Sequence, residues 1–306
     1  MRPYMSSDQL QFHPLELSDY SRITSNYLQH NPSRLCDWSP GSIWMWRDYF
    51  HMEYAEMEGT LIFKLKYLGQ ITAFSFQMNE NYSDVIQKLK EYCHSNETPL
   101  VLCLVEQAFL EKIRTEEHCF HEKEESDWFD YLYRTSDIQN YTGKRYATQR
   151  NHIHAFLRDV PDITVTEGFI DPEEAKAFLD EFYANKEVTD PIELEEKIKT
   201  YEVFRLQQLY NLKTIALRSK GKIIGLAAGE VQGDTVFEHI EKAMEQYTGV
   251  YPYLAQQFAK LFDPEVVQYI NREEDCGDPG LRYSKEKYRP ITKLSKYTVE
   301  ICHNPE

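Results

Sequence analysis

The sequence is poor in glycine and has no long apolar run. Its 306 residues include 12 glycines but 22 tyrosines. Because such large side chains need packed surroundings, this composition excludes an extensively disordered chain. No window approaches roughly 18 uninterrupted apolar residues, and residues 1–9 lack the apolar core of a signal peptide. We therefore expect a globular, cytoplasmic protein without stable insertion into a membrane.

Cysteine pairs at C-x-x-C spacing are also lacking. In a chain of this length, such scattering is typical of reduced thiols rather than of a disulfide framework. Cys119 and His121 would share one face of a strand, but a third and a fourth metal ligand are not apparent. We therefore predict reduced thiols and no metal site. The six cysteines are Cys36, Cys93, Cys103, Cys119, Cys276 and Cys302.

Basic residues are fewer than acidic ones, 34 against 50, and the net charge of −16 would repel nucleic acid if it were spread evenly. Two segments depart from this balance. Residues 281–296 contain six basic residues against Glu286, and residues 143–158 contain no acid. This segregation is typical either of a site for anionic groups or of a solvated helix face, and both interpretations stay open. The basic residues of the earlier segment are Lys144, Arg145, Arg150 and Arg158.

The predicted elements follow a similar order in the two halves of the chain. After Pro161 the pattern indicates a strand, two helices, the first of them capped by Asp171, a meander of three strands, and then alternating helices and strands. The meander of the first half is expected at residues 51–57, 60–66 and 70–76. This order predicts mixed α/β sheets in two tandem acetyltransferase-like domains, with bounds 1–160 and 161–306, the first ending in the basic helix. The second-half elements are expected at residues 163–168, 172–185, 191–210, 213–219, 222–230, 235–241, 252–262, 266–270, 281–287 and 293–301.

An acidic cluster follows the apolar strand expected at residues 266–270. The sequence there is Asn271-Arg-Glu-Glu-Asp275, and it leads through glycines into a basic helix. The carboxyl end of a buried strand is where α/β folds place ligand chemistry. A structural ion-pair network is the alternative interpretation of these charges. The predicted catalytic residues are Glu241, Glu273, Asp275 and Tyr288.

A glycine turn precedes the helix expected from Pro252. Backbone N–H groups at a helix N-terminus bind the pyrophosphate of coenzyme A in acetyltransferases of this fold. We therefore assign donor binding to Gln246, Gly249 and Tyr251. The ring of Tyr251 stands where the backbone must approach phosphate closely, which disfavours ordinary coenzyme A binding. A plain strand-to-helix turn is the alternative.

Several motifs follow one another from Asp130 to the end of the chain. They are Gly143-Lys-Arg-Tyr-x-x-x-Arg150-Asn-His-Ile153, Phe237-Glu-His-Ile-Glu-Lys-Ala243, Tyr247-x-Gly249-x-Tyr251, Tyr269-Ile-Asn-Arg-Glu-Glu-Asp275, Gly280-Leu-Arg282, Ser284-Lys285 and Tyr288-x-Pro290. In this order they resemble the phosphatidylglycerol lysyltransferase C-terminal-domain family. The resemblance implies a tandem acetyltransferase-like (GNAT-like) fold, similar to that of peptidoglycan-bridge aminoacyltransferases, and transfer of an aminoacyl group from charged tRNA to an amine or hydroxyl.

This reaction needs cationic contacts for the nucleic-acid or small-molecule acyl donor. The chain lacks a membrane-spanning flippase region, so we expect an amino acid, a peptide or a small amine as acceptor. Two alternatives stay open: an N-acetyltransferase that uses acetyl- or another acyl-coenzyme A, and a non-catalytic module that binds an amino acid or peptide. No cofactor is assigned. The predicted substrate-binding residues are Asn271, Arg272, Arg282, Lys285, Arg289, Lys144, Arg145 and Arg150.

Overall fold

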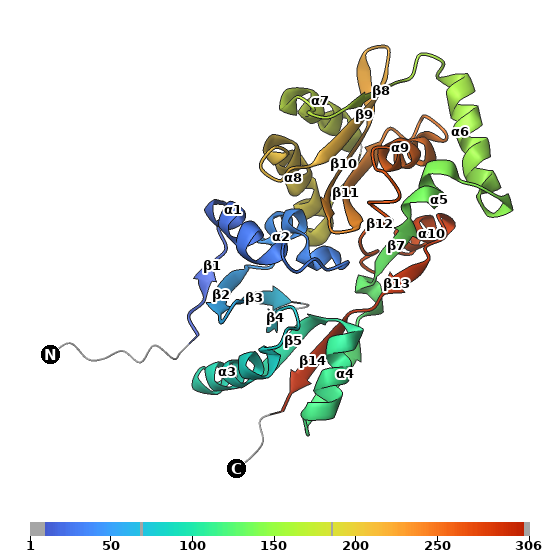
Figure 1. The fold of residues 1–306 in the computed structure, drawn as a ribbon. Helices are drawn as coiled ribbons and strands as arrows, with labels where there is room; N and C mark the ends of the chain where they lie inside the picture. Colours follow the sequence, from blue (N-terminus) through green and yellow to red (C-terminus); the bar gives the residue numbers. More distant parts are fainter. Residues whose placement is uncertain (1–9, 68–69, 185, 303–306) are drawn as a thin grey trace. The chain divides into compact units, whose positions relative to one another are not determined.

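The computed structural model describes residues 10–67, 70–184 and 186–302, and its internal packing divides the chain into two units (Figure 1). Unit 1 consists of the described parts of Met1–Asn31, Arg47–Phe129 and Ser295–Glu306. Unit 2 consists of the described parts of Pro32–Trp46 and Asp130–Leu294. Residue 160, where we placed the domain boundary, lies inside unit 2 by this division.

Unit 1 is built on a mixed sheet. In its described residues the strands have the spatial order β1-β2-β3-β4-β5-β14-β6, and only the pair β4–β5 is parallel. The meander β2-β3-β4 matches the strands predicted there. The strands are β1 (His13–Pro14), β2 (Glu53–Met57), β3 (Thr60–Tyr67), β4 (Ile71–Ser75), β5 (Leu100–Val105), β6 (Phe120–Glu124) and β14 (Tyr297–Ile301).

Two amphipathic helices supply much of the core of unit 1. The apolar face of α3 (Tyr82–Ser95) packs Val85 and Leu89 against the sheet, and α4 (Gln107–Glu116) contributes Leu110. These side chains are buried, as their three- and four-residue spacing predicts. The shorter helical segments of the unit are η1 (Leu17–Asp19), α1 (Tyr20–Ile23), the π-helix η2 (Thr24–Leu28) and η4 (Ser126–Trp128).

Unit 2 contains a second mixed sheet. Its described strands have the order β13-β7-β12-β11-β10-β9-β8, and only the pair β11–β12 is parallel. The predicted meander is present as β9-β10-β11. The strands are β7 (Asp130–Arg134), β8 (Thr164–Glu167), β9 (Lys213–Ser219), β10 (Lys222–Gln232), β11 (Thr235–Ala243), β12 (Tyr269–Asn271) and β13 (Thr292–Leu294).

Three helices of unit 2 begin at an aspartate cap. The Asp171 carboxylate accepts hydrogen bonds from two backbone N–H groups of α7, which confirms the predicted cap. Asp190 and Asp278 act in the same way for α8 and α10. The helical segments are η3 (Cys36–Trp38), α2 (Pro40–Trp46), α5 (Thr135–Asn140), η5 (Lys144–Tyr146), α6 (Ala147–Asp159), α7 (Pro172–Tyr183), α8 (Pro191–Leu206), α9 (Val250–Ala259) and α10 (Pro279–Lys287).

The prediction of one final strand at residues 293–301 was wrong. The segment forms two strands in different sheets: β13 pairs with β7 in unit 2, and β14 lies between β5 and β6 in unit 1. Figure 1 shows the red β14 beside β5. The chain thus leaves one sheet after Leu294 and enters the other at Tyr297, a change of partner that composition alone does not encode.

The prediction of reduced thiols was wrong for one pair. Cys119 and Cys302 form a disulfide, with their Cα atoms 5.3 Å apart. Their backbones are already joined, because Cys302 N donates to the Cys119 carbonyl at 3.0 Å beside the paired strands β6 and β14. The 183 residues that separate them in sequence hide this proximity.

Candidate functional site

A β-bulge in β11 shapes the polar centre of unit 2. Glu238 pairs with Gly229 of β10 and Ile240 pairs with Ala228, so His239 is the additional residue between them. A Cβ atom on Gly229 would lie 2.1 Å from the carbonyl oxygen of Phe237. The bulge therefore requires glycine at position 229.

The bulge brings two carboxylates onto one side of the strand. Strict alternation would place Glu238 and Glu241 on opposite faces, but the additional residue reverses that relation. Both carboxylates contact the guanidinium of Arg272, at 2.7 Å from Nε to Glu238 and through Nη2 to Glu241. Arg272 follows β12, which runs parallel to β11, and its guanidinium carbon lies 4.6 Å from the ring centroid of Tyr288.

Burial sets the proton affinities of this Glu238–Glu241–Arg272 cluster. It raises the pKa of Glu238 to about 8, with the charge of Glu241 adding to the effect and Arg272 opposing it. Burial also raises the pKa of Glu241. Burial opposes the charge of Arg272, but the two carboxylates outweigh it and raise the arginine pKa. Glu238 therefore changes protonation within the range in which most enzymes work.

The cluster holds three buried polar atoms without a hydrogen-bond partner among the described residues. They are Oε1 of Glu238, Oε1 of Glu241 and Nη1 of Arg272. The Glu238 side chain is only 3% exposed and that of Arg272 is 10% exposed. A buried polar atom without a partner is costly, at about 1–3 kcal/mol. The two carboxylate oxygens can thus each accept a hydrogen bond from a ligand, and Arg272 Nη1 can donate one to it.

His239, the bulged residue, lies between two further carboxylates. Its Nδ1 is 2.7 Å from Glu273 Oε1, and its Nε2 is 3.0 Å from Glu230 Oε1. Glu230 also accepts from the Gly41 N–H at 2.5 Å, at the start of α2. Burial lowers the pKa of His239, but the hydrogen bonds to Glu230 and Glu273 outweigh it and raise the pKa to about 10. His239 is therefore an imidazolium at neutral pH.

Asp275 belongs to a separate ion pair. Arg282 donates to both of its carboxylate oxygens, at 2.8 and 2.7 Å, and the Tyr131 hydroxyl donates at 2.5 Å. Burial opposes the ionised form of Asp275, but these hydrogen bonds, the Arg282 contact first, outweigh it and lower the pKa. A carboxylate engaged in this way is a poor base, so its geometry matches the structural-network interpretation.

Lys285 and Tyr288 lie beside the cluster in buried positions. Lys285 donates through Nζ to the Arg272 carbonyl, and burial lowers its pKa, as does the nearby charge of Arg272. Burial raises the pKa of Tyr288, and Glu241 adds to the effect. Asn271 donates to Asp130 and to the Arg34 carbonyl, both at 2.7 Å.

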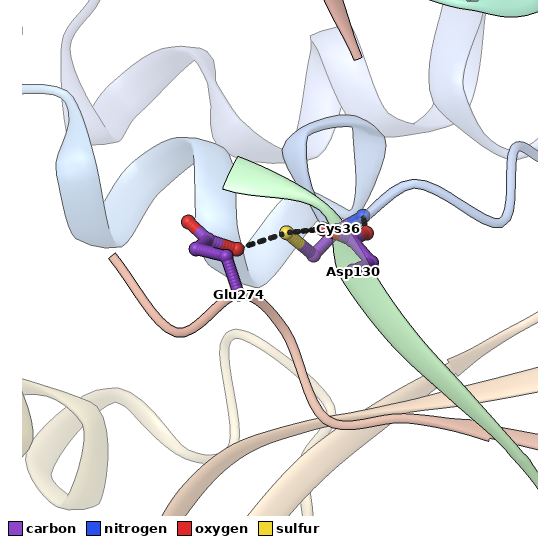
Figure 2. Close-up of side chains that lie close together, drawn as sticks. All are labelled: Cys36, Asp130 and Glu274. Atoms are coloured by element: carbon purple, nitrogen blue, oxygen red, sulfur yellow. Dashed lines mark hydrogen bonds between the residues drawn. The ribbon is translucent and has the colours of Figure 1, made fainter. Parts of the chain in front are cut away.

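Asp130, which accepts from Asn271, lies close to a thiol and a second carboxylate. Figure 2 shows these three side chains, Cys36, Asp130 and Glu274. Single ligand atoms of Cys36, Asp130 and Glu274 all lie within 4.8 Å of one another. The Cys36 thiol is 3.3 Å from Asp130 and 3.1 Å from Glu274, and the Cys36 N–H donates to Asp130 at 2.7 Å. These hydrogen bonds account for the grouping, and we assign no metal to it.

The predicted donor turn is packed against a helix. Gly249 has φ +88°, and a Cβ atom there would lie 2.2 Å from the His152 carbonyl oxygen of α6. The Tyr251 hydroxyl lies 3.4 Å from the Ala243 N–H at the end of β11, while Gln246 is exposed. The side of Gly249 that a Cβ atom would occupy thus packs against α6.

The basic segment before α6 has mixed surroundings. Arg150 donates to the carbonyls of Tyr141 and Gly143, so its guanidinium fastens the loop. Arg145 pairs with Asp137 at 2.7 Å. Lys144 is exposed, as is Arg289 after α10.

The structure thus brings together some of the predicted residues and separates others. Glu241, Arg272, Lys285 and Tyr288 form one neighbourhood, and Glu273 adjoins it through His239. From the sequence we selected none of Glu230, Glu238 and His239 as site residues. Glu238 and His239 lie inside a matched motif, and Gly229 in β10 was the available signal for the bulge.

Comparison with known proteins identifies chains of similar sequence and fold. Over 175 residues the chain is 25% identical to an uncharacterised protein of Mycoplasmoides gallisepticum, a match that spans 56% of each chain. A conserved protein of unknown function from Bacteroides thetaiotaomicron superposes with a TM-score of 0.87 and 27% identity, over 96% of this chain and 100% of that one.

Two more distant structures share the fold. L-PGS from Bacillus licheniformis has a TM-score of 0.64 and 12% identity, over 99% of this chain and 95% of its own. FemX has a TM-score of 0.58 and 10% identity, over 96% and 98%. With the two mixed sheets, these likenesses confirm the predicted tandem acetyltransferase-like (GNAT-like) fold.

No helix in the described part of the chain is both long and apolar enough to cross a bilayer. The family model described as phosphatidylglycerol lysyltransferase, C-terminal, matches residues 32–300. Since this match covers well over half of the sequence, the chain belongs to the phosphatidylglycerol lysyltransferase C-terminal family.

Proposed function

We propose that the chain is an aminoacyltransferase and that the Glu238–Glu241–Arg272 cluster of unit 2 recognises the aminoacyl group. The observation that carries this proposal is the set of buried atoms without partners: two carboxylate oxygens and one guanidinium nitrogen. An aminoacyl ester offers the complement, because its ammonium donates hydrogen bonds and its carbonyl accepts them. The family membership and the fold shared with L-PGS and FemX support the same reaction class.

Each atom of the cluster has a role in this proposal. Glu241 Oε1 accepts from the α-ammonium of the donor, and Arg272 Nη1 donates to the carbonyl oxygen. Charge develops on that oxygen as the tetrahedral intermediate forms, so a fixed cation beside it stabilises the transition state. Tyr288, whose pKa is raised by burial, keeps its proton and is a second hydrogen-bond donor at this place.

Glu238 is the proposed general base. Its pKa of about 8 is close to the pH at which a base both accepts and releases protons efficiently. The acceptor amine attacks the ester carbonyl, a C–N bond forms, and the amine proton passes to Glu238. The ester C–O bond then breaks, and the leaving 3′ oxygen of the donor takes up that proton.

A tRNA donor needs contacts for its phosphates. The exposed cations Lys144 and Arg289 are available for such contacts, whereas Arg150 and Arg145 already hold protein groups. We therefore expect binding to weaken steeply with salt, because each phosphate contact releases counterions. Lys144→Gln should reduce the salt dependence of tRNA binding. Lys222→Gln, at an exposed position of β10, is the matched control and should leave that dependence unchanged.

The reaction itself is tested with a mixture of charged tRNAs and small amine acceptors, including free amino acids. Mass spectrometry should detect new amides with the wild type, and Glu238→Gln should slow their formation at least about 100-fold, a typical effect of losing a general base. If charged tRNA binds and no amide forms with any acceptor, the chain is a binding module rather than an enzyme.

An acyl-coenzyme A donor would give a different result. Acetyl-coenzyme A at millimolar concentration would raise the melting temperature of an enzyme that binds it. The packing of Gly249 against α6 predicts no such shift.

A further inference from the structure

Unit 1 contains an open pocket with a volume of about 740 Å³. Such a volume lies within the range of small-molecule sites, roughly 300–1,000 Å³. Lys64 and Lys66 of β3 line the pocket together with Thr72 of β4 and with Asn96, which follows the end of α3. It lies wholly within unit 1, so the site proposed above in unit 2 does not contribute to it.

The charge of the pocket lining differs from that of the whole chain. Three of its residues are basic, Arg47, Lys64 and Lys66, against Asp48 and Glu53. The whole chain, in contrast, has 50 acidic and 34 basic residues. The lining therefore has an excess of positive charge on a strongly acidic protein.

The cations differ in how they are held. Lys64 contacts Glu53 and lies 3.4 Å from the Tyr92 hydroxyl, so a carboxylate already balances its charge. Arg47 lies 3.5 Å from Asp48, and its side chain is only 12% exposed. Lys66, in contrast, donates to the uncharged hydroxyl of Thr72 at 2.8 Å. The Lys66 ammonium is thus the charge most available to a ligand.

Apolar groups line the pocket beside these cations, including Leu15, Met52 and Leu65. The Tyr92 carbonyl, in the last turn of α3, already accepts hydrogen bonds from the N–H and the side-chain amide of Asn96. A ligand that fits has an anionic group for Lys66 and an apolar body for the remaining wall.

We propose that this pocket binds a small organic anion, a phosphate or carboxylate group attached to an apolar or ring-shaped body. Lys66 holds the anionic group, and Arg47 and Lys64 add positive potential. The apolar body packs on Leu15 and Met52. This site is separate from the aminoacyl cluster and stands whether or not the chain transfers aminoacyl groups.

The test uses phenyl phosphate, benzoate, inorganic phosphate and benzylamine, each titrated into the full chain and followed by calorimetry and by amide chemical shifts. Phenyl phosphate or benzoate should bind at millimolar concentration or tighter, inorganic phosphate more weakly, and benzylamine not at all. The shift changes should map to β3, the start of β4 and the end of α3.

Lys66→Gln should weaken binding about tenfold, the effect of losing one charge-assisted hydrogen bond. Lys88→Gln removes the same charge from α3, where Lys88 pairs with Glu91, and should leave the affinity unchanged. Equal weakening by the two variants would indicate a general charge effect and overturn the proposal. Absence of binding at 10 mM, or binding of benzylamine as tight as that of benzoate, would overturn it too.

Discussion

Glu238 and Glu241 contact the same arginine although three positions separate them in β11. A regular strand would direct these side chains to opposite faces, and the additional residue His239 brings them together. The polar centre of unit 2 therefore depends on a local irregularity of the backbone. The same irregularity places His239 between Glu230 and Glu273.

Gly229→Ala should destroy this arrangement, because the new Cβ would lie 2.1 Å from the Phe237 carbonyl oxygen. We expect a loss of about 2–4 kcal/mol in the free energy of unfolding, as for other overpacked positions. Gly225→Ala is the control in the same strand, since its Cβ would meet Ala243 and Leu217 at ordinary distances of 3.4 and 3.5 Å. If urea unfolding shows equal losses of stability for the two variants, the bulge does not require glycine at position 229.

Gly249→Ala tests the packing of α9 against α6. The alanine Cβ would lie 2.2 Å from the His152 carbonyl oxygen, at a backbone φ of +88°. Gly143→Ala has nearly the same φ, +86°, with nothing within 4 Å, so it reports the backbone strain alone. Thermal unfolding should show the Gly249 variant to be less stable than the control by about 2 kcal/mol or more. A difference close to zero would mean that the turn is open.

His239 should keep its proton well above neutral pH. Its pKa of about 10 in the folded chain exceeds the ordinary value of 6.5. Its contribution to stability is therefore complete below pH 6.5 and is lost as the pH rises toward 10. Nitrogen NMR at pH 8 should show the His239 ring as an imidazolium. A neutral ring at that pH would contradict the buried contacts of His239 with Glu230 and Glu273. The exposed His154 of α6 is the comparison within the same spectrum.

The disulfide predicts a definite thiol count. Four other cysteines of the described chain form no disulfide: Cys36, Cys93, Cys103 and Cys276. Titration of protein purified without reductant and then denatured should give four thiols, and mass spectrometry should find Cys119 linked to Cys302. Six thiols would support the reduced state that composition predicts. Cys302→Ser should lower the stability of unit 1 by about 2–5 kcal/mol, the usual loss with a native disulfide.

Local signals in the sequence predicted much of the fold. The meander β9-β10-β11 follows from apolar runs divided by turns, and α7 begins at the Asp171 cap as expected. The predicted strand at residues 266–270 is shorter and later, Tyr269–Asn271, but the polar residues do follow its end. These features depend on neighbouring residues, which periodicity and capping rules describe.

The features that escaped prediction depend on distant residues. The pairing of β14 with β5, and of Cys119 with Cys302, joins segments that lie far apart in the sequence. The bulge at His239 depends on how two strands pair, and period-2 alternation concealed that Glu238 accompanies Glu241. Tertiary pairing thus decided both the partner of the last strand and the composition of the candidate site.

The most direct test of the central claim is whether the protein distinguishes charged from uncharged tRNA. A mixed pool, aminoacylated or deacylated, is titrated into the wild type and into Glu241→Gln at one fixed, low salt concentration. The account predicts that the wild type binds the charged pool at least about tenfold more tightly, since one hydrogen bond to a charged group contributes about 1.5–3 kcal/mol. Glu241→Gln should lose most of this preference while it keeps its affinity for the uncharged pool. Equal affinity of the wild type for both pools would contradict recognition of an aminoacyl group by this cluster.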